Sequence, residues 1–367
     1  MKRRAAIVGC GIVGAMIAYE LSQVSDLEVH VFDRQSPAQG STGAALGVLM
    51  GIISHKVKGR TWRLREASIR RYHSLIPELE AKLGQSIPFN YQGILSLCFA
   101  AESLERWQSL QAKRQAQGWP LEIWSPSQLH ARCPHIQTSG VQAAIYSPQD
   151  GQVSPTELTL ALVAAAAQQG AVFHWQTEIT GLCADGQACQ QLQTSAGTVS
   201  VDWVVLSAGL GSAALSQASD RPVAMVPVLG QAMTVRLSRL LGDPAFQPVI
   251  NGDDIHLVPL GEGRYWIGAT VEFPPETGVY SWQELAPKTE LLETLRQGAI
   301  AYCPALATAD VIKTWVGLRP RPQGQAAPVI QPLSGYRNVT VASGHYRNGV
   351  LLAPATALQV KAMIAAG

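Results

Sequence analysis

The 367-residue chain has little charge, few cysteines and no long hydrophobic run. Charged residues make up 15% of the sequence, whereas a typical soluble domain has about 25%. With 28 basic and 26 acidic residues, the net charge is +2. A nucleic-acid-binding protein needs a clear basic excess to displace counterions, so the composition excludes that class. Because no run of about 18 apolar residues occurs, we expect no membrane-spanning helix.

Six cysteines are too few to build a disulfide scaffold in a chain of this length. We therefore expect ordinary thiols. Cys183 and Cys189 flank a predicted turn at Asp185-Gly186 and could face each other across a hairpin, but unbridged strand thiols are the favoured interpretation.

Apolar residues and glycine are plentiful, at 47% of the chain and 33 residues respectively. The chain is therefore globular, and at roughly 100–200 residues per domain it is long enough for two domains. Neither an internal repeat nor a low-complexity linker divides it, so the two domains are expected to be interleaved in sequence.

The first 33 residues carry the pattern of a dinucleotide-binding unit. Residues 5–8 form a short apolar run typical of a buried parallel strand. This run leads into Gly9-Cys10-Gly11-Ile12-Val13-Gly14, then into a helical pattern and a second predicted strand, residues 28–32, which ends in Asp33. An acid at about this distance from the glycines is expected of the motif. The basic start, residues 2–4, imitates a signal peptide, but the glycines and the acid favour the nucleotide interpretation.

Each motif residue has a separate physical reason. Gly9 permits the tight turn, Gly11 lets the backbone approach a pyrophosphate, and Gly14 allows the helix to pack closely on the strand. The helix N-terminus offers unpaired amides and partial positive charge to the phosphates. Asp33 can accept from ribose hydroxyls, which disfavours a cofactor with a 2′-phosphate. The alternative is a glycine-rich turn that binds no nucleotide.

The pattern after Asp33 favours a flavin over a nicotinamide, because the βαβ repeat of a nicotinamide domain does not continue. Residues 39–47 are small and flexible, so they could run beside a flat ring system with their amides directed at it. The alternative is a plain surface loop.

The rest of the chain alternates between helical and strand patterns. Helices are predicted near residues 60–83, 102–117, 155–168 and 350–366, and strands near 93–99, 172–179, 194–199, 202–207, 226–237, 255–268 and 339–342. Turns are predicted at Asp150-Gly151 and at Gly261-Glu262-Gly263.

Several strings together resemble one family of flavoproteins. They are residues 42–45 (TGAA), 150–155 (DGQVSP), 204–209 (VVLSAG), 226–231 (VPVLGQ), 315–320 (WVGLRP) and 344–356 (GHYRNGVLLAPAT). With the glycine motif they resemble the D-amino-acid oxidase superfamily of FAD-dependent oxidoreductases, and within it the glycine oxidases of thiamine biosynthesis. The resemblance spans nearly the whole chain.

This resemblance implies an α/β fold in which a Rossmann-like FAD-binding domain is interleaved with an antiparallel-sheet α+β substrate domain. The FAD-binding domain would comprise residues 1–85, 140–215 and 310–367, and the substrate-binding domain residues 86–139 and 216–309. The FAD would be non-covalent, because no cysteine follows Cys303. No metal site is expected. The cofactor-binding residues would be Gly9, Gly11, Ile12, Val13, Gly14, Asp33, Arg34, Thr42, Gly43, Ala44, Ala45, Gly47, Val48, Leu49, Ile179, Ala208, Gly209, Gly344, His345, Tyr346, Arg347, Asn348, Gly349, Val350 and Leu351.

Arg319 is the residue that the resemblance assigns to the substrate carboxylate. A guanidinium suits this task because it makes a bidentate, orienting pair. The alternative is a structural arginine or a surface ion pair. Pro320, Pro322 and Gly324 predict a turn at the mouth of the site.

The chain departs from the family on the predicted strand 254–259. His256 stands where the family has a tyrosine, and it would bind a carboxylate better when protonated. Asp254, predicted on the same strand face, would favour that protonated form. An exposed Asp254 and a structural His256 are an equal alternative, and Asp254 is also a candidate contact for a substrate amino group. Tyr346 is a candidate wall of the site, Arg347 lines it or pairs outside it, and His345 is expected to be no base.

By resemblance the reaction would be oxidation of a small amino acid or amine. Hydride would pass from the α-carbon to flavin N5, and the imine would hydrolyse to a keto acid and ammonia while oxygen or another acceptor reoxidises the flavin, giving hydrogen peroxide with oxygen. Two alternatives stay open. One is a dehydrogenase that passes electrons to a membrane quinone and docks through the basic segment 56–71; the other is a non-catalytic flavin-binding subunit. The protein is expected in the cytoplasm, and a homo-oligomer stays open.

Overall fold

The computed structural model describes residues 2–273 and 285–366. It contains a six-stranded sheet in which all neighbouring strands are parallel except the antiparallel pair at one edge. In spatial order the strands are β19 (Val329–Pro332), β20 (Val339–Ser343), β13 (Trp203–Leu206), β1 (Arg3–Val8), β2 (Leu27–Phe32) and β9 (Val172–His174). The central strands are continuous apolar runs because both faces of the sheet are covered.

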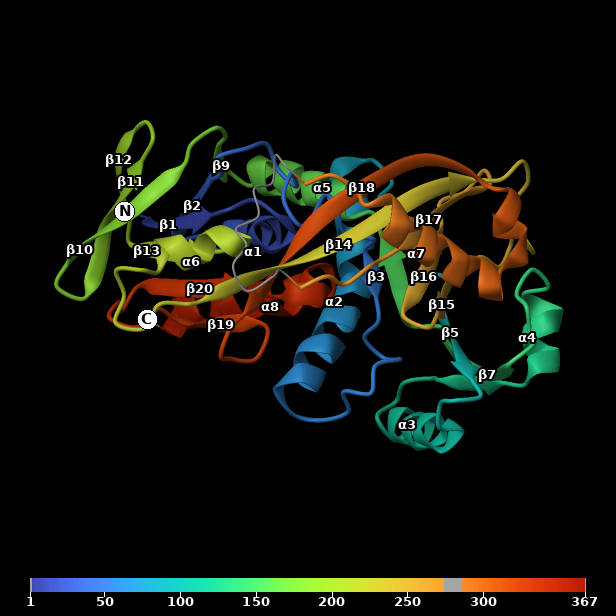
Figure 1. Cartoon of the computed structure of the whole chain (residues 1–367). Coiled ribbons are helices and arrows are strands. Elements are labelled where there is room, and N and C mark those ends of the chain that lie inside the picture. The colour runs from blue at the N-terminus through green and yellow to red at the C-terminus, as the bar shows by residue number, and fades with distance from the viewer. Residues whose placement is uncertain (1, 274–284, 367) are drawn as a thin grey trace.

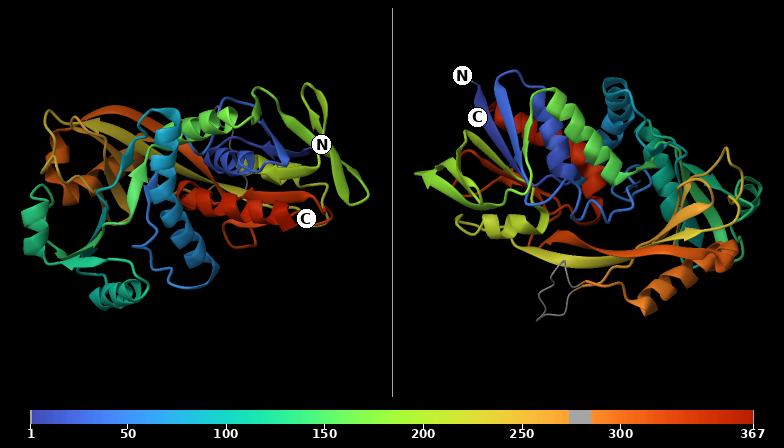
Figure 2. Two further views of the ribbon diagram at one scale, coloured as in Figure 1. Left: turned by 180° about the vertical axis from the view of Figure 1, so that it is seen from behind. Right: turned by 90° about the horizontal axis from the view of Figure 1, so that it is seen from above.

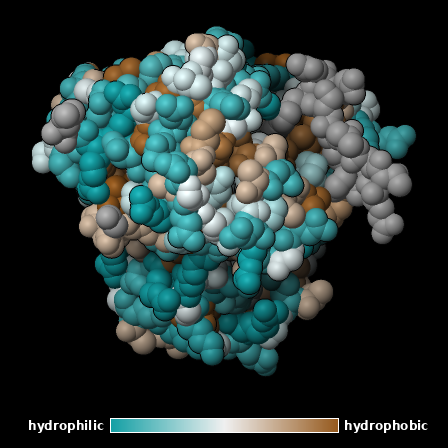
Figure 3. Space-filling view, turned by 90° about the vertical axis from the view of Figure 1, so that its left-hand side faces the viewer, coloured by the Kyte–Doolittle hydropathy of each residue, from teal (hydrophilic) through white to brown (hydrophobic). Residues whose placement is uncertain are grey.

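Helices cover one face of this sheet and a small sheet covers the other. The helices are α1 (Ile12–Ser22), α5 (Pro155–Gln168) and α8 (Gly349–Ala366), which lie side by side in Figure 2, with α2 (Gly59–Leu83) packed on α8. The opposite face packs against β10 (Ile179–Asp185), β11 (Ala188–Thr194) and β12 (Gly197–Ser200). Each face of the six-stranded sheet therefore has its own hydrophobic core. Adjacent residues of β1 belong to different cores, because Ile7 faces the helices and Ala6 faces the small sheet. The end of the molecule that carries the small sheet is largely hydrophilic on its surface (Figure 3).

The second large sheet has eight strands and is antiparallel except where β15 pairs with β5. Its order is β18 (Asp310–Pro322), β14 (Met225–Arg236), β17 (Arg264–Gly268), β16 (Ile255–Pro259), β15 (Val249–Gly252), β5 (Ile94–Phe99), β7 (Val141–Ser147) and β6 (Glu122–Trp124). The helices α7 (Thr289–Tyr302) and α4 (Pro126–Arg132) cover one face. The helix α3 (Leu104–Ala116) and the segment 46–53 cover the other.

Two elements join the large sheets. Strands β14 and β18 pair from one end to the other, from Met225↔Pro322 to Arg236↔Asp310, and run side by side across the molecule in Figure 1. A three-stranded sheet of β3 (Val48–Leu49), β8 (Gly151–Val153) and β4 (Phe89–Asn90) lies where the chain crosses between them. The short helices are η1 (Gly209–Gly211), α6 (Ser212–Leu215), η2 (Pro304–Thr308) and η3 (Tyr346–Asn348).

The predicted fold class is confirmed, and most predicted elements occur within a few residues of their expected bounds. Strand 172–179 is wrong: β9 ends at His174, the chain turns through Gln176 with a positive φ of 54°, and Ile179 begins the next sheet. Residues 194–199 contain the turn of the β11–β12 hairpin and not one continuous strand. The turn expected at Asp150-Gly151 lies just before it, because Gly151 already begins β8. The six cysteines are free thiols.

The proposed domain boundaries need two changes. Strands β7 and β18 belong to the eight-stranded sheet, whereas the expected boundaries at 140 and 310 assign both to the FAD-binding domain. We therefore propose to move these boundaries to the ends of the two strands, after Ser147 and after Pro322. The same observation corrects the turn expected at Pro320 and Pro322, since both prolines lie within β18.

The stretch Tyr346–Ala366, which contains α8, is long and apolar enough to cross a membrane by length and composition. Residues of α8 instead form much of the core beneath the six-stranded sheet, where the helix contacts α1 and α2. A helix buried between other helices is apolar on all sides for that reason.

Candidate functional site

The turn between β1 and α1 has no room for a side chain at Gly9 or at Gly14. A Cβ atom on Gly14 would lie 1.9 Å from the carbonyl oxygen of Gly9, and one on Gly9 would lie 2.7 Å from Cα of Ala208. The hydroxyl of Ser207 lies 3.0 Å from the carbonyl oxygens of both Val8 and Gly9. The start of α1 and the C-terminal end of β13 are therefore pressed together, and the amides at this edge of the sheet can approach a ligand closely.

Polar side chains fix the same edge. The carboxylate of Asp33 accepts hydrogen bonds from the amides of Cys10 (2.6 Å) and Gln35 (2.8 Å). The buried hydroxyl of Thr42 accepts from the amide of Ile12 at 2.9 Å. Arg34 lies at the surface, 3.8 Å from Glu178. The acid therefore stands at the carboxyl end of β2, in the position expected for a ribose-binding group.

The small-residue loop 39–47 runs between the two large sheets. Trp315 of β18 donates through Nε1 to the carbonyl oxygen of Ala44 at 3.0 Å. A Cβ on Gly317 would lie 2.3 Å from Cβ of Ala44, so the strand needs glycine where the loop crosses it. Ser41 donates to the carbonyl oxygen of Leu318 at 2.6 Å. The loop is therefore an internal junction and not a plain surface loop.

The string 344–349 follows β20 and opens α8 beside the same junction. His345 is buried, and its Nε2 lies 2.9 Å from Oγ1 of Thr356. Burial, helped by the charge of Arg60, lowers the pKa of His345 to about 3, so this imidazole is neutral and only a weak base near neutral pH. Asn348 accepts from Nη2 of Arg65 at 3.0 Å. Val350 and Leu351 are core residues of α8, so their backbone alone could reach a ligand.

Arg319 lies on the face of the eight-stranded sheet that meets this junction. Its Nη1 donates to the carbonyl oxygen of Leu229 at 2.9 Å. Its guanidinium lies directly over Gly230, because a Cβ there would fall 2.3 Å from both terminal nitrogens. Burial lowers the pKa of Arg319, and the nearby charge of Arg347 lowers it further, although the group stays cationic. A half-buried cation with unused donors is a suitable partner for a carboxylate.

Asp254 and His256 do not share a strand face as predicted. Asp253 and Asp254 form the turn of the β15–β16 hairpin, with positive φ angles of 49° and 61°, and the strand begins one residue later. Asp254 instead pairs with Arg347 at 2.7 Å. This pair joins the hairpin turn to the string that opens α8.

Of the two equal interpretations of this strand, the structure favours the exposed Asp254 with a neutral His256 over the protonated His256. Its pKa is lowered to about 4 because burial outweighs the opposing charge of Asp254, and Arg347 adds to the lowering. His256 therefore cannot act as a cationic clamp on a carboxylate near neutral pH. Between it and Arg319 the sheet face carries Gly230, Ala232 and Gly268. A Cβ on Gly268 would lie 2.8 Å from Cδ1 of Leu46, so the loop packs directly on this part of the sheet.

A sequence comparison identifies the family. The profile described as "FAD dependent oxidoreductase" matches residues 4–363. The chain belongs to this family of FAD-dependent oxidoreductases. Among curated relatives, glycine oxidase of Geobacillus kaustophilus is 28% identical over 98% of this chain and 92% of its own length. The bifunctional protein ThiO/ThiG of Trichormus variabilis is 30% identical over 97% of this chain, which spans 52% of that relative.

Solved structures of the family agree with this result. Glycine oxidase from Bacillus cereus superposes with a TM-score of 0.86 at 26% identity, covering 100% of this chain and 96% of that one. L-proline dehydrogenase from P. horikoshii superposes with the same TM-score of 0.86 at 22% identity, covering 100% and 94%. At 22% identity, the likeness to L-proline dehydrogenase shows only that the two proteins share a fold.

The residues present fit the FAD that the family binds. The glycine turn at the start of α1 is crowded by the backbone around it, and Asp33 stands at the carboxyl end of β2, in the position expected for a ribose-binding group. Within the described residues, no group of three or more His, Cys, Asp or Glu side chains could hold a metal. The chain is thus an FAD-dependent enzyme whose candidate cofactor residues from the glycine motif, the loop 42–49 and the string 344–351 meet at one junction.

Two buried ionic groups in this region escaped the sequence analysis. The carboxylate of Asp150 accepts from the amides of Gly51, Ile52 and Ile53, each at 2.8 Å, and so fixes the chain just after β3. Burial raises the pKa of Asp150, and these hydrogen bonds oppose the rise. Arg114 donates to the carbonyl oxygen of Ile52 at 2.6 Å from the opposite side. Buried charges of this kind are retained when amides or carbonyls satisfy them.

The basic segment 56–71 is largely engaged within the protein. Arg65 is buried and donates to Met50 and Asn348. Arg60 donates to the carbonyl oxygen of Pro328, Arg70 pairs with Glu66, and Arg71 pairs with Glu20 and Glu78. Lys56, Lys58 and Arg63 are exposed. Most of the segment therefore has structural partners, which weakens the interpretation as a lipid-docking surface.

Proposed function

We propose that this protein is a glycine-oxidase-like enzyme that oxidises a small amino acid or amine and passes the electrons to oxygen. The observation that carries the proposal is the guanidinium of Arg319, which lies over Gly230 and donates one hydrogen bond, to the carbonyl oxygen of Leu229. The relatives named glycine oxidase support this substrate class, and the bifunctional ThiO/ThiG relatives support a link to thiamine biosynthesis.

Arg319 would bind and orient the substrate carboxylate. Of the five N–H groups of a guanidinium, one is used on Leu229, and Arg319 has no other hydrogen bond within residues 2–273 and 285–366. The remaining donors can grip a carboxylate in two places. Fixing the carboxylate fixes the α-carbon, and positioning of this kind supplies much of the rate in an enzyme that needs little acid–base chemistry.

The surrounding residues would shape the site and keep water out. Tyr346 has a positive φ of 55°, and its ring lies 5.8 Å from the guanidinium of Arg321, so it is a candidate side wall. Trp315 holds the loop carbonyl of Ala44 against the sheet. Bound FAD would supply the two-electron oxidation, at the junction that these residues surround.

The two alternative functions have less support. The quinone-linked dehydrogenase relied on a free basic segment, and most of those cations are engaged. The non-catalytic subunit relied on the altered hairpin, yet the carboxylate-binding arginine is present and has donors to spare. Cytoplasmic location and assembly into a homo-oligomer remain part of the proposal, the latter measurable by light scattering of the holoenzyme.

Anaerobic titration of the holoenzyme tests the proposal. Glycine and other small amino acids or amines should bleach the yellow flavin absorbance, and admission of air should restore it with formation of hydrogen peroxide. Bulky amino acids are the matched control and should bleach it slowly or not at all. Failure of every amino acid and amine to bleach the flavin would overturn the proposal, and bleaching that only a quinone reverses would favour the dehydrogenase.

A further inference from the structure

Helix α8 contains a proline, Pro354, in its second turn. Proline has no N–H, so it cannot donate to the carbonyl oxygen four residues earlier, which is that of Val350. Val350 is buried, and a buried carbonyl that is left without a donor is costly. The first turn of α8 therefore needs a hydrogen-bond partner from another part of the chain.

Helix α2 supplies this partner. The hydroxyl of Tyr72 donates to the carbonyl oxygen of Val350. Next to the proline, the amide of Ala355 donates to Oγ of Ser68 at 3.2 Å. Tyr72 and Ser68 are both buried, and at four residues apart they lie on one face of α2. Side chains of α2 thus bind α8 on both sides of Pro354.

The hydroxyl of Tyr72 stays a donor at neutral pH. Burial raises the pKa of Tyr72 well above its ordinary value, so the hydroxyl keeps its proton. The hydrogen bond to the carbonyl oxygen of Val350 is therefore a permanent replacement for the one that Pro354 removes from the helix.

A third side chain on this face of α2, that of Arg65, contacts the string that precedes α8. Its Nη2 donates to Oδ1 of Asn348 at 3.0 Å, and its Nη1 donates to the carbonyl oxygen of Met50. Arg65 is three residues before Ser68, which is the spacing of neighbours on a helix face. Arg65 therefore links the residue that follows β3 to the string that opens α8.

The contact with Arg65 determines which way the side-chain amide of Asn348 faces. A guanidinium only donates hydrogen bonds, so the oxygen of the amide faces Arg65. The nitrogen Nδ2 is then directed away from Arg65, and it has no hydrogen-bond partner within residues 2–273 and 285–366. Asn348 thus holds two free N–H donors beside the first turn of α8.

We propose that Tyr72 and Arg65 of α2 are positioning residues that hold the first turn of α8 against bound FAD. Tyr72 replaces the hydrogen bond that Pro354 removes, and Arg65 fixes the amide of Asn348. Amides at the start of a helix favour negative charge, and the flavin gains negative charge on reduction. Helix α2 carries none of the candidate FAD-binding residues, yet it sets both the affinity for FAD and the reduction potential. The inference rests on FAD lying beside the string 344–351 and is independent of the substrate proposed above.

Loss of the Tyr72 hydroxyl, and its rescue, test the first half of the proposal. Titration of apo-protein with FAD should show that Tyr72→Phe binds FAD about tenfold more weakly, the loss expected for one buried hydrogen bond. Pro354→Ala returns an N–H that can donate to Val350. In a Pro354→Ala background, Tyr72→Phe should therefore change the FAD affinity by less than about threefold. Unchanged FAD affinity in Tyr72→Phe, or an equal loss in both backgrounds, would overturn the role of Tyr72.

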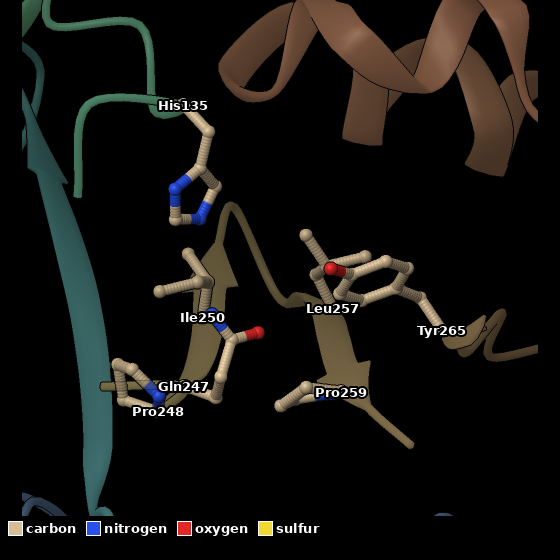
Figure 4. A pocket seen from close by; sticks show the side chains of 7 residues that line it. All are labelled: His135, Gln247, Pro248, Ile250, Leu257, Pro259 and Tyr265. Atoms are coloured by element: carbon tan, nitrogen blue, oxygen red, sulfur yellow. The ribbon is translucent and has the colours of Figure 1, made fainter. Parts of the chain in front are cut away.

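Tyr265→Phe is the matched control for a general loss of stability. Tyr265 is also buried, and its hydroxyl accepts from the amide of Leu241 at 2.8 Å. Figure 4 shows it beside Leu257 at a small cavity, in the core that α7 covers. Tyr265→Phe should lower the melting temperature as Tyr72→Phe does, but FAD affinity should not change. An equal loss of FAD affinity in both variants would show a general structural effect and overturn the proposal.

The reduction potential tests the second half. Dye-coupled reduction of the holoenzyme, without substrate, should give Arg65→Met a midpoint potential lower by about 30 mV, which corresponds to a tenfold greater loss of affinity for reduced than for oxidised FAD. In an Asn348→Ala background, Arg65→Met should lower the potential no further, because its effect passes through Asn348. Arg63→Met is the control, since Arg63 is an exposed cation on the same helix.

The outcomes separate this inference from the proposed function. An unchanged potential in Arg65→Met, or the same shift with and without Asn348, would overturn the role of Arg65. Tyr72→Phe removes a single oxygen atom, so it tests the proposal even where Arg65→Met does not fold. None of these measurements uses a substrate. Failure of every amino acid and amine to bleach the flavin would therefore overturn the proposed function alone.

Discussion

The candidate nucleotide end and the proposed substrate end of this site are built in opposite ways. At the nucleotide end the backbone of the glycine turn is pressed against Ala208, and a single carboxylate, Asp33, is fixed by amides. At the substrate end the groups are charged side chains, Arg319, Arg347 and Asp254, carried by β18, the string before α8 and a hairpin turn. A backbone surface tolerates no added atom, whereas a side-chain surface can lose one member and keep its shape.

The largest effect is expected from an added methyl group at the nucleotide end. In Gly14→Ala the new Cβ would lie 1.9 Å from the Gly9 carbonyl oxygen, so the turn must open. Overpacking of this kind costs about 1–3 kcal/mol or more, and we expect a protein that purifies without yellow colour and melts at a lower temperature. Gly40→Ala is the control, because a Cβ there meets nothing within 4 Å. Full retention of FAD by Gly14→Ala would show that the backbone surface at the nucleotide end does tolerate an added atom.

The second largest effect, a loss of kcat/KM, is expected at the substrate end. Arg319→Ala should keep its FAD but lose about 100-fold or more in kcat/KM, since hydrogen bonds to charged groups are each worth about 1.5–3 kcal/mol. Steady-state oxygen uptake and the absorbance of the purified protein measure the two quantities. Arg236→Ala, an exposed arginine at the far end of the same strand pair, should leave both unchanged. An unchanged kcat/KM in Arg319→Ala would show that Arg319 does not bind the substrate carboxylate.

A smaller effect should separate cofactor binding from turnover. Asp33→Asn keeps an oxygen for one amide but loses the charge that accepts from Cys10 and Gln35. We expect FAD affinity to fall about tenfold, the loss of one charge-assisted hydrogen bond. At saturating FAD, kcat should be close to that of the wild type. A large fall in kcat at saturation would mean that the two ends are not independent.

A still smaller effect is expected at the ion pair between the two sheets. Asp254→Asn removes the negative charge that pairs with Arg347. The side chain of Asp254 is 61% exposed and that of Arg347 is 36% exposed. Exposed pairs contribute about 0–1 kcal/mol to stability, so the melting temperature should hardly move. KM for a small amino acid should change by a few fold, because Arg347 and Arg319 influence each other. A large loss of stability would show that the pair holds the two sheets together.

No effect on either end of the site is expected from a change at His135. The pKa of His135 is lowered by burial from 6.5 to about 4, so the unfolded chain binds more protons than the folded one between these values. Its contribution to stability is therefore fully present above pH 6.5 and is lost as the pH falls toward 4. His135→Gln should flatten this part of the melting-temperature profile without changing FAD affinity or kcat/KM.

The same contrast explains what could be predicted from sequence. Gly9, Gly14 and Asp33 lie within one βαβ unit, where spacing alone determines which atoms meet. The structure accordingly brings Gly14 beside Gly9, and Asp33 to the amide of Cys10. The substrate end is assembled from distant strands. Arg347 and Asp254 are 93 residues apart, and no local pattern pairs them. The sequence Gly252-Asp253-Asp254 did carry a turn signal that would have moved Asp254 off the strand. The neutral state of His256 depends on burial, which no spacing reveals.

The order of strands in the six-stranded sheet has a consequence for synthesis of the protein. Strand β1 is made first, yet it is flanked through β13 by β20, and α1 is covered by α8 at the other end of the chain. Domains generally form as the chain emerges from the ribosome, N-terminal parts first. Here the glycine turn must wait for residues 339–366 before its surroundings are complete, so a ribosome-bound chain stalled before β20 should hold no flavin.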